Sequence, residues 1–267
     1  MRRKPSKKEL LLKNFEPGFV VPRQWLAGFG LTSYDLNVLE ARGFLELPSK
    51  GIYTRWPNQL CWQSVVYSLQ QFFRLDIAPG GITALHLHGF EMPSPVSDAI
   101  HLYGFAYFPA WVRKTLSGTT LVYHCSTNAL QRMDDSGDRA MAAPDFNLSD
   151  FTVDYSTWNV ELPFRISSPE RAIVEMLSEV PGLVSFNEAL TIFQQADSLS
   201  AESLTVLLEN SKTPIRRLFF LFAERCGHKW VQSVSPERVA IGKGKRRIVK
   251  GGQLNKKYLI TVEDGWE

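Results

Sequence analysis

The chain has 267 residues, of which 44% are hydrophobic, and a formal net charge of only +3. This composition supports packed cores and excludes global disorder, and the length suggests two domains or three small ones. No apolar run reaches the ~20 residues of a membrane-spanning helix, and the basic N-terminus lacks the apolar core of a signal peptide. Three isolated cysteines (Cys61, Cys125 and Cys226) predict no disulfide framework, so a cytoplasmic protein is expected.

The charges are unevenly distributed along the chain. Residues 1–60 hold ten Lys and Arg against five Asp and Glu, residues 61–212 hold eight against seventeen, and residues 213–267 hold twelve against five. Basic ends around an acidic middle favour contact with a polyanion. A solvated charge asymmetry without a ligand is the alternative.

The first predicted elements are a helix over Lys7–Asn14 and, within Phe15–Arg55, a winged helix-turn-helix, the module that places one helix in a DNA groove. Pro22 suits the first position of a short helix, and the glycines that follow it mark a tight turn. Thr32 and Asp35 have the spacing of a capping box for the second helix. Two short strand-like runs (Leu45–Leu47 and Ile52–Arg55) then predict the hairpin that forms the wing.

The second helix of this module presents a polar face that could read bases. Ser33, Tyr34 and Asn37 carry hydroxyl and amide groups that suit base edges or phosphates, whereas Glu40 is unfavourable near phosphate. Basic and polar residues of the preceding helix and the wing would lie near the DNA backbone. The expected DNA-facing residues are Arg23, Gln24, Ser33, Tyr34, Asn37, Lys50 and Arg55. The alternative is a winged module used for protein contact or as a spacer.

Residues 58–166 predict a mixed α/β region and residues 167–267 a helical region that ends in a hairpin. A long helix over 58–78 is followed by a segment that is either helix or strand, Ile82–His88. Further predicted elements are strands at Ala99–Tyr107, Thr119–His124, Phe151–Tyr155 and Asn159–Pro163, a short helix at Pro109–Leu116, and a polar loop at Arg132–Asn147. Four helices are then expected over 167–178, Phe186–Gln195, Ala201–Asn210 and Pro214–Cys226.

The C-terminal segment is predicted to form a basic β-hairpin. Its strands would be Lys245–Val249 and Lys257–Val262, around Gly251-Gly252. Its cations could neutralise phosphates without reading sequence, or bind an acidic protein or the acidic middle of this chain. The residues of this predicted patch are Lys243, Lys245, Arg246, Arg247, Lys250, Lys256 and Lys257. The expected fold class is therefore α+β, with a winged domain over 1–57 and a larger domain over 58–267.

No catalytic or metal-binding pattern is present, so neither an enzyme nor a cofactor is expected. The histidines and cysteines (His86, His88, His101, His124, Cys125, Cys226 and His228) lack the spacing of a zinc site. Asp154 and Glu161 could serve a nuclease, but no lysine follows Glu161. The acidic loop Asp134–Asp138 lacks a nucleotidyl-transfer context, and Gly242–Lys245 lacks the spacing of a phosphate-binding loop. A metal-dependent enzyme acting on nucleic acid is the least favoured alternative.

Four blocks in a fixed order carry a resemblance to a known family. They are ARGFLELPSKGIYTR (41–55), GGITALHLHGF (80–90), ELPFRISSPERAIVEML (161–177) and GKGKRRIVKGGQLNKKYLITV (242–262). With these blocks the chain resembles the AbiEi antitoxins of type IV toxin–antitoxin systems, which act in abortive infection, a phage defence.

The resemblance implies an N-terminal winged helix-turn-helix and a larger C-terminal antitoxin domain within 58–267. It implies repression of the protein's own operon through inverted repeats, with the DNA-facing residues given above. It also implies a partner toxin of nucleotidyltransferase type. A protein-interaction module whose winged helix does not bind DNA is the leading alternative.

Overall fold

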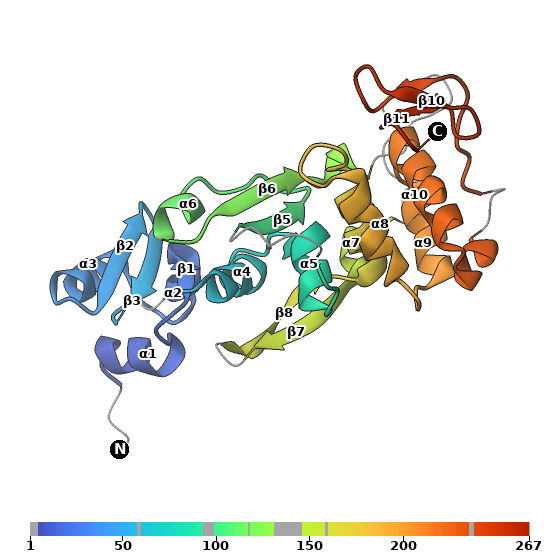
Figure 1. Cartoon of the computed structure of the whole chain (residues 1–267). Coiled ribbons are helices and arrows are strands. Elements are labelled where there is room, and N and C mark those ends of the chain that lie inside the picture. The colour runs from blue at the N-terminus through green and yellow to red at the C-terminus, as the bar shows by residue number, and fades with distance from the viewer. Residues whose placement is uncertain are drawn as a thin grey trace.

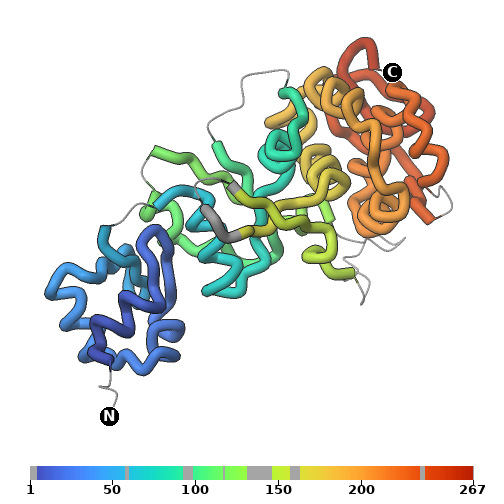
Figure 2. Tube along the Cα trace, turned by 90° about the horizontal axis from the view of Figure 1, so that it is seen from below, coloured from blue at the N-terminus to red at the C-terminus, as the bar shows by residue number. Residues whose placement is uncertain are grey.

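The computed structural model describes residues 5–57, 60–92, 99–116, 118–130, 146–157, 160–234 and 238–266. It is a mixed α+β structure, as predicted, with three hydrophobic cores. Figure 1 shows the three lobes in chain order along an elongated molecule, and Figure 2 shows from a second direction that the two termini lie at opposite ends.

The N-terminal lobe has the element order expected for a winged helix-turn-helix. Its elements are α1 (Lys7–Asn14), β1 (Val20–Pro22), α2 (Arg23–Gly28), α3 (Ser33–Ala41), β2 (Leu45–Ser49) and β3 (Ile52–Arg55). The strands form an antiparallel sheet in the order β1-β3-β2. Pro22, expected at the first helical position, is instead the N-cap of α2, because its extended backbone also pairs with Ile52.

Within the described residues, the middle lobe contains two small sheets, three α-helices and two short 3-10 helices, Ser126–Asn128 and Leu148–Phe151. Its elements are α4 (Trp62–Gln71), β4 (Ile77–Pro79), α5 (Gly81–Leu87), β5 (Ile100–Gly104), α6 (Val112–Thr115), β6 (Leu121–Cys125), β7 (Thr152–Thr157) and β8 (Val160–Ser167). β5 pairs antiparallel with β4 and parallel with β6, whereas β7 and β8 form a separate hairpin.

Two expectations for the middle lobe are refined by the structure. The helix predicted over 58–78 was too long: it ends at Gln71, Arg74 has a φ of 56°, and Ile77–Pro79 pairs with β5 as a strand. Pairing with a neighbouring strand determines that this segment is a strand; its apolar pattern alone does not distinguish helix from strand. The ambiguous segment after Gly80 is a helix. Most of the predicted polar loop, residues 131–145, lies outside the described residues.

The C-terminal lobe begins with the four predicted helices. They are α7 (Pro169–Leu177), α8 (Phe186–Gln194), α9 (Ala201–Glu209) and α10 (Thr213–Cys226). The first three are capped by Ser168, Ser185 and Ser200, whose side chains accept hydrogen bonds from backbone N–H groups of the first turn. Gly227, at a φ of 69°, ends α10 in the left-handed conformation that favours glycine.

The strand pairing at the C-terminus differs from the predicted hairpin. The strands are β9 (Arg246–Arg247), β10 (Gln253–Asn255) and β11 (Ile260–Val262), in the order β10-β11-β9. The antiparallel hairpin is β10–β11, whereas β9 pairs with β11 in parallel. The predicted pairing of 245–249 with 257–262 as a hairpin was therefore wrong. The chain turns at Gly251-Gly252 and forms β10 before it reaches β11, so β10 takes the antiparallel position.

Contacts across β1 join the N-terminal and middle lobes. Val21 packs in the N-terminal core, whereas its neighbour Val20 packs in the middle core, because successive strand residues face opposite sides. The backbone N–H of Val20 also donates to the Ser68 hydroxyl of α4 at 3.0 Å. Phe72, just after α4, packs against the N-terminal core. Packing therefore continues across the predicted boundary at residue 57.

A buried ion pair joins the middle and C-terminal lobes. The Arg171 guanidinium donates to the Glu175 carboxylate at 2.7 Å, and both side chains are fully buried. The same carboxylate accepts hydrogen bonds from the Gly81 N–H at 3.0 Å and from the Ser167 hydroxyl at 2.8 Å. A Cβ on Gly80 would lie 2.1 Å from this carboxylate, so a side chain at position 80 would clash with it.

Among the described residues, no helix combines the length and apolar composition needed to cross a bilayer.

Candidate nucleic-acid interface

Helix α3 occupies the position of the second, groove-entering helix of the predicted winged module. Its start is set by the predicted capping box: the Thr32 N–H donates to the Asp35 carboxylate at 2.8 Å, and the Asp35 N–H donates to the Thr32 hydroxyl at 3.2 Å. The backbone hydrogen bond from Thr32 lowers the pKa of Asp35. Leu36 and Leu39 anchor the opposite face in the core, as predicted.

The outer face of α3 presents the expected base-reading residues to solvent. Ser33, Tyr34, Asn37 and Glu40 are all exposed, and Tyr34 is 77% exposed. Figure 1 shows α3 at the end of the molecule that is farthest from the C-terminal lobe.

Arg23 connects the start of α2 with the start of α3 and with the turn of the wing. Its guanidinium donates to the Ser33 hydroxyl at the start of α3. Its backbone N–H donates at 2.9 Å to the carbonyl of Gly51 in the turn of the wing. Lys50 is exposed in the same turn, and Gln24 is exposed in the first turn of α2. Six of the seven predicted residues therefore lie on the three segments that Arg23 joins: α2, α3 and the turn of the wing.

Arg55 is placed differently from the other predicted residues. Its guanidinium donates to the carbonyl of Phe15 at 2.7 Å and to that of Leu12 at 3.5 Å. These carbonyls lie at the C-terminal end of α1, where a helix leaves carbonyls unpaired and favours a cation. Arg55 therefore fastens α1 to β3.

Arg42 is a candidate contact that the sequence analysis did not include. It is the C-cap residue of α3 and is exposed. The sequence could have indicated this candidate, because Arg42 is a basic residue at the end of the predicted second helix. Its positive charge would offset the negative charge of Glu40, which is unfavourable near phosphate.

The predicted C-terminal basic patch is divided between the two edges of the last sheet. Arg246 and Arg247 form the edge strand β9, whereas Lys256 and Lys257 follow the opposite edge strand, β10. Lys243, Lys245 and Lys250 are also exposed, in the segments that flank β9.

A buried arginine holds the glycine-rich loop that precedes β9. Arg217 of α10 is fully buried, and it donates to the carbonyls of Ile241 at 2.8 Å, Gly242 at 3.1 Å and Gly244 at 2.7 Å. It also donates to the carbonyl of Leu259 at 2.9 Å. This one side chain therefore fixes the loop that carries Lys243.

Two histidines that are far apart in the sequence meet in the structure. Nδ1 of His101 lies 2.8 Å from Nε2 of His124, and Nδ1 of His124 lies 2.9 Å from the Glu179 carboxylate. Burial and the neighbouring His124 lower the pKa of His101 to about 4. Burial opposes ionisation of Glu179, but the hydrogen bond and charge of His124, the hydrogen bond from Ser178 and the charge of His101 together outweigh it, so the pKa of Glu179 is lowered.

The other residues considered for metal chemistry do not assemble into a site. No group of three or more His, Cys, Asp or Glu within the described ranges could hold a metal ion. Asp154 on β7 lies opposite Arg165 on β8, so Glu161, four residues earlier on β8, is not its cross-strand neighbour. The side chain of Glu161 and the acidic loop 134–138 lie outside the described residues.

The fold and the exposed helix α3 place the chain in a structural class. It is a three-lobed α+β protein whose N-terminal lobe has the connectivity of a winged helix-turn-helix. Comparison with known families then identifies the chain. Residues 4–92 match the family described as "Transcriptional regulator, AbiEi antitoxin N-terminal domain", and residues 97–263 match "Transcriptional regulator, AbiEi antitoxin, Type IV TA system". The chain belongs to the AbiEi antitoxin family, which confirms the predicted resemblance.

A solved structure supports the fold. The chain is similar to the RV2827C protein from Mycobacterium tuberculosis, with a TM-score of 0.50 and 16% sequence identity. The similarity covers 97% of this chain and 92% of that chain. At this identity the comparison supports the arrangement of the elements alone. A search of curated proteins finds no match.

Proposed function

We propose that this protein represses its own operon by binding an inverted-repeat operator through the N-terminal lobe. We also propose that it counteracts a nucleotidyltransferase-like toxin. Membership of a family of transcriptional regulators and type IV antitoxins supports both parts. The proposed division of labour assigns DNA binding to residues 1–57 and antitoxin function to residues 58–267.

The observation that carries the DNA-binding part is the exposed polar face of α3 beside Arg23 and Lys50. Ser33, Tyr34 and Asn37 are proposed to contact base edges, since hydroxyl and amide groups can donate to and accept from bases in the major groove. Their positions are set by a capped helix with a buried opposite face, so the contacts would be preorganised.

The phosphate contacts are proposed to come from the segments around α3. Arg23 and Gln24 lie at the start of α2, and Lys50 lies in the turn of the wing. Cations and amides at such positions fix the register of a protein on DNA and supply affinity that does not depend on sequence. Arg55 is proposed to act indirectly, because its guanidinium holds α1 against the sheet.

The C-terminal lobe is proposed to contribute through its exposed cations. Those of β9 and its flanking segments could bind phosphate or a protein partner. The proposed mode of antitoxin action is binding, without catalysis by this chain.

A competition gel shift tests the DNA-binding part. Purified full-length protein is incubated at physiological salt with the DNA immediately upstream of its own gene, and a random duplex serves as competitor. Retention of the shifted band against excess random duplex is the expected result. Equal competition by both duplexes would contradict the operator role.

A growth assay tests the antitoxin part. The toxin encoded beside this gene is induced in cells that carry either the full chain or a chain whose α3 face is changed by Ser33→Ala and Asn37→Ala. Both chains are expected to restore growth, because the antitoxin function is assigned to residues outside α3. Failure of the full chain to restore growth would contradict the antitoxin role.

A further inference from the structure

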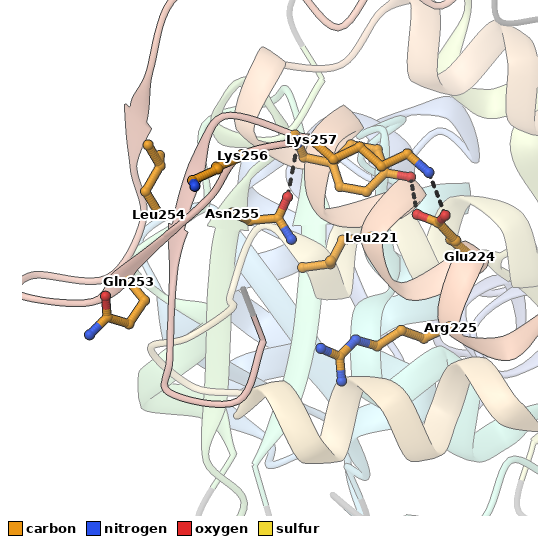
Figure 3. A pocket seen from close by; sticks show the side chains of 9 residues that line it. Leu221, Glu224, Arg225, Gln253, Leu254, Asn255, Lys256 and Lys257 are labelled. Atoms are coloured by element: carbon orange, nitrogen blue, oxygen red, sulfur yellow. Dashed lines mark hydrogen bonds and ion pairs between the residues drawn. The ribbon is translucent and has the colours of Figure 1, made fainter.

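A pocket lies between the end of α10 and the hairpin β10–β11. Its volume is about 680 Å³, which is within the range of ligand-binding pockets. Leu221, Glu224 and Arg225 of α10 form one side. The other side is formed by β10 and the turn after it, Gln253–Tyr258. Figure 3 shows the α10 side chains facing those of the hairpin.

Hydrogen bonds and an ion pair within the protein hold the walls of the pocket in place. Both oxygens of Glu224 are occupied, one by the Lys257 ammonium and the other by the Tyr258 hydroxyl at 2.7 Å. Asn255 accepts from the Tyr258 N–H at 2.9 Å and donates to the carbonyl of Trp266 at 3.2 Å. The turn after β10 is therefore fixed against α10 by contacts within the protein itself.

These contacts leave the pocket with positive character. Among the described residues that line it, Glu224 is the one acidic side chain, and it is already paired with Lys257. Arg225 also lines the pocket; its guanidinium lies 4.2 Å from the centre of the Trp266 ring and donates through one nitrogen to the Gly265 carbonyl. Lys256 is exposed and takes part in none of the ion pairs found among the described residues.

The pocket also has an apolar component and is open to solvent. Leu221, which is 4% exposed, and the half-buried Leu254 contribute aliphatic surface. The side chains at the rim remain accessible: Glu224 is 51% and Lys257 63% exposed. An extended segment that lies across the pocket suits this shape better than a small molecule that must be enclosed.

We propose that this pocket, which we call the α10–β10 pocket, binds an acidic segment of a partner protein. Carboxylates of the segment would pair with Lys256 and Arg225, and apolar side chains between them would pack on Leu221 and Leu254. Protein–protein interfaces commonly combine complementary charges at the rim with apolar contacts in the centre. This role is separate from DNA binding by α3 and does not depend on it.

The probe is a fluorescein-labelled peptide of about twelve residues in which Glu and Leu alternate, measured by fluorescence polarisation with the full chain. The variants are Lys256→Glu, which reverses a rim charge, and Leu254→Gln, which removes apolar surface. Lys229→Glu is the matched control, because Lys229 is exposed in the same lobe, outside the pocket and outside the predicted basic patch. A single-stranded oligothymidylate of equal length is the second probe.

Saturable binding of the peptide is expected, with a loss of about tenfold or more in Lys256→Glu and in Leu254→Gln and less than about twofold in Lys229→Glu. Equal losses in Lys256→Glu and Lys229→Glu would overturn the proposal, because they would indicate general charge attraction. Absence of peptide binding, or tighter binding of the oligothymidylate with the same sensitivity to Lys256→Glu, would also overturn it. Operator binding measured on the same samples should stay unchanged, which separates this outcome from the DNA-binding proposal.

Discussion

Asn37 is the residue whose proposed role is the most specific. It is exposed on α3, one helical turn after Ser33, and its amide can donate and accept at once. We expect Asn37→Ala to weaken binding to the upstream DNA by about 1–3 kcal/mol, the usual contribution of a base-reading contact. Affinity for a random duplex should be unchanged, as measured by competition gel shift. An equal loss on both duplexes would rule out base reading by Asn37.

Lys50 should behave in the opposite way, because its ammonium, in the wing turn, is proposed to contact phosphates and not bases. Lys50→Ala is expected to lower affinity for upstream and random DNA alike. The slope of log K against log salt should become shallower by about one, since one phosphate contact is lost. Binding isotherms at several salt concentrations measure this slope, with Lys229→Ala as a control of the same charge change outside the N-terminal lobe. A slope that does not differ from that of the unmodified protein would remove Lys50 from the phosphate contacts.

Among the elements, the loop before β9 depends most strongly on one side chain. Arg217 is buried with four backbone carbonyls as its partners, so its removal would leave buried acceptors unpaired. We expect Arg217→Met to lower the free energy of unfolding by about 3 kcal/mol, whereas Arg247→Met at an exposed position should change it by less than about 0.5 kcal/mol. Chemical denaturation followed by fluorescence measures both. Similar stabilities of the two variants would show that the loop is held by other contacts.

Helices and strands of this protein differ in how far local sequence determines them. The capping residues Thr32 and Ser168 and the terminating Gly43 locate the helix ends of α3 and α7 within one or two residues. The strand β4 was predicted as helix, because its three residues form a strand only through pairing with β5. A strand forms its backbone hydrogen bonds with a segment that is remote in sequence. Its local sequence pattern therefore predicts it less reliably than the pattern of a helix does.

For the whole molecule, the histidine pair makes stability depend on pH. The pKa of His101 is about 4 in the folded protein, below the 6.5 of a free histidine, so the unfolded chain binds this proton first as the pH falls. The contribution of His101 to the free energy of unfolding is fully present above pH 6.5 and is lost as the pH falls toward 4. We expect the free energy of unfolding to be lower at pH 5 than at pH 8 by about 1–2 kcal/mol from His101.

Denaturation of two variants at both pH values tests this origin. His101→Gln should have a smaller difference between pH 8 and pH 5, whereas His86→Gln, at an exposed position, should keep the difference of the unmodified protein. If His101→Gln kept the full difference, another group would be responsible.

By itself, the sequence determined the α+β class, the helices of the N- and C-terminal lobes, the polar face of α3 and the resemblance to the AbiEi antitoxins. The helices and the polar face rest on caps, glycines and periodicity within short stretches, where neighbours in sequence are neighbours in space, whereas the resemblance rests on four sequence blocks in a fixed order. Only the tertiary structure decided the parallel pairing of β9 with β11, the engagement of Arg55 with α1 and the meeting of His101 with His124. It also created the α10–β10 pocket, whose two walls are separated by nearly thirty residues. Such features depend on contacts between distant segments, and a local pattern carries no information about which distant segment will become the neighbour.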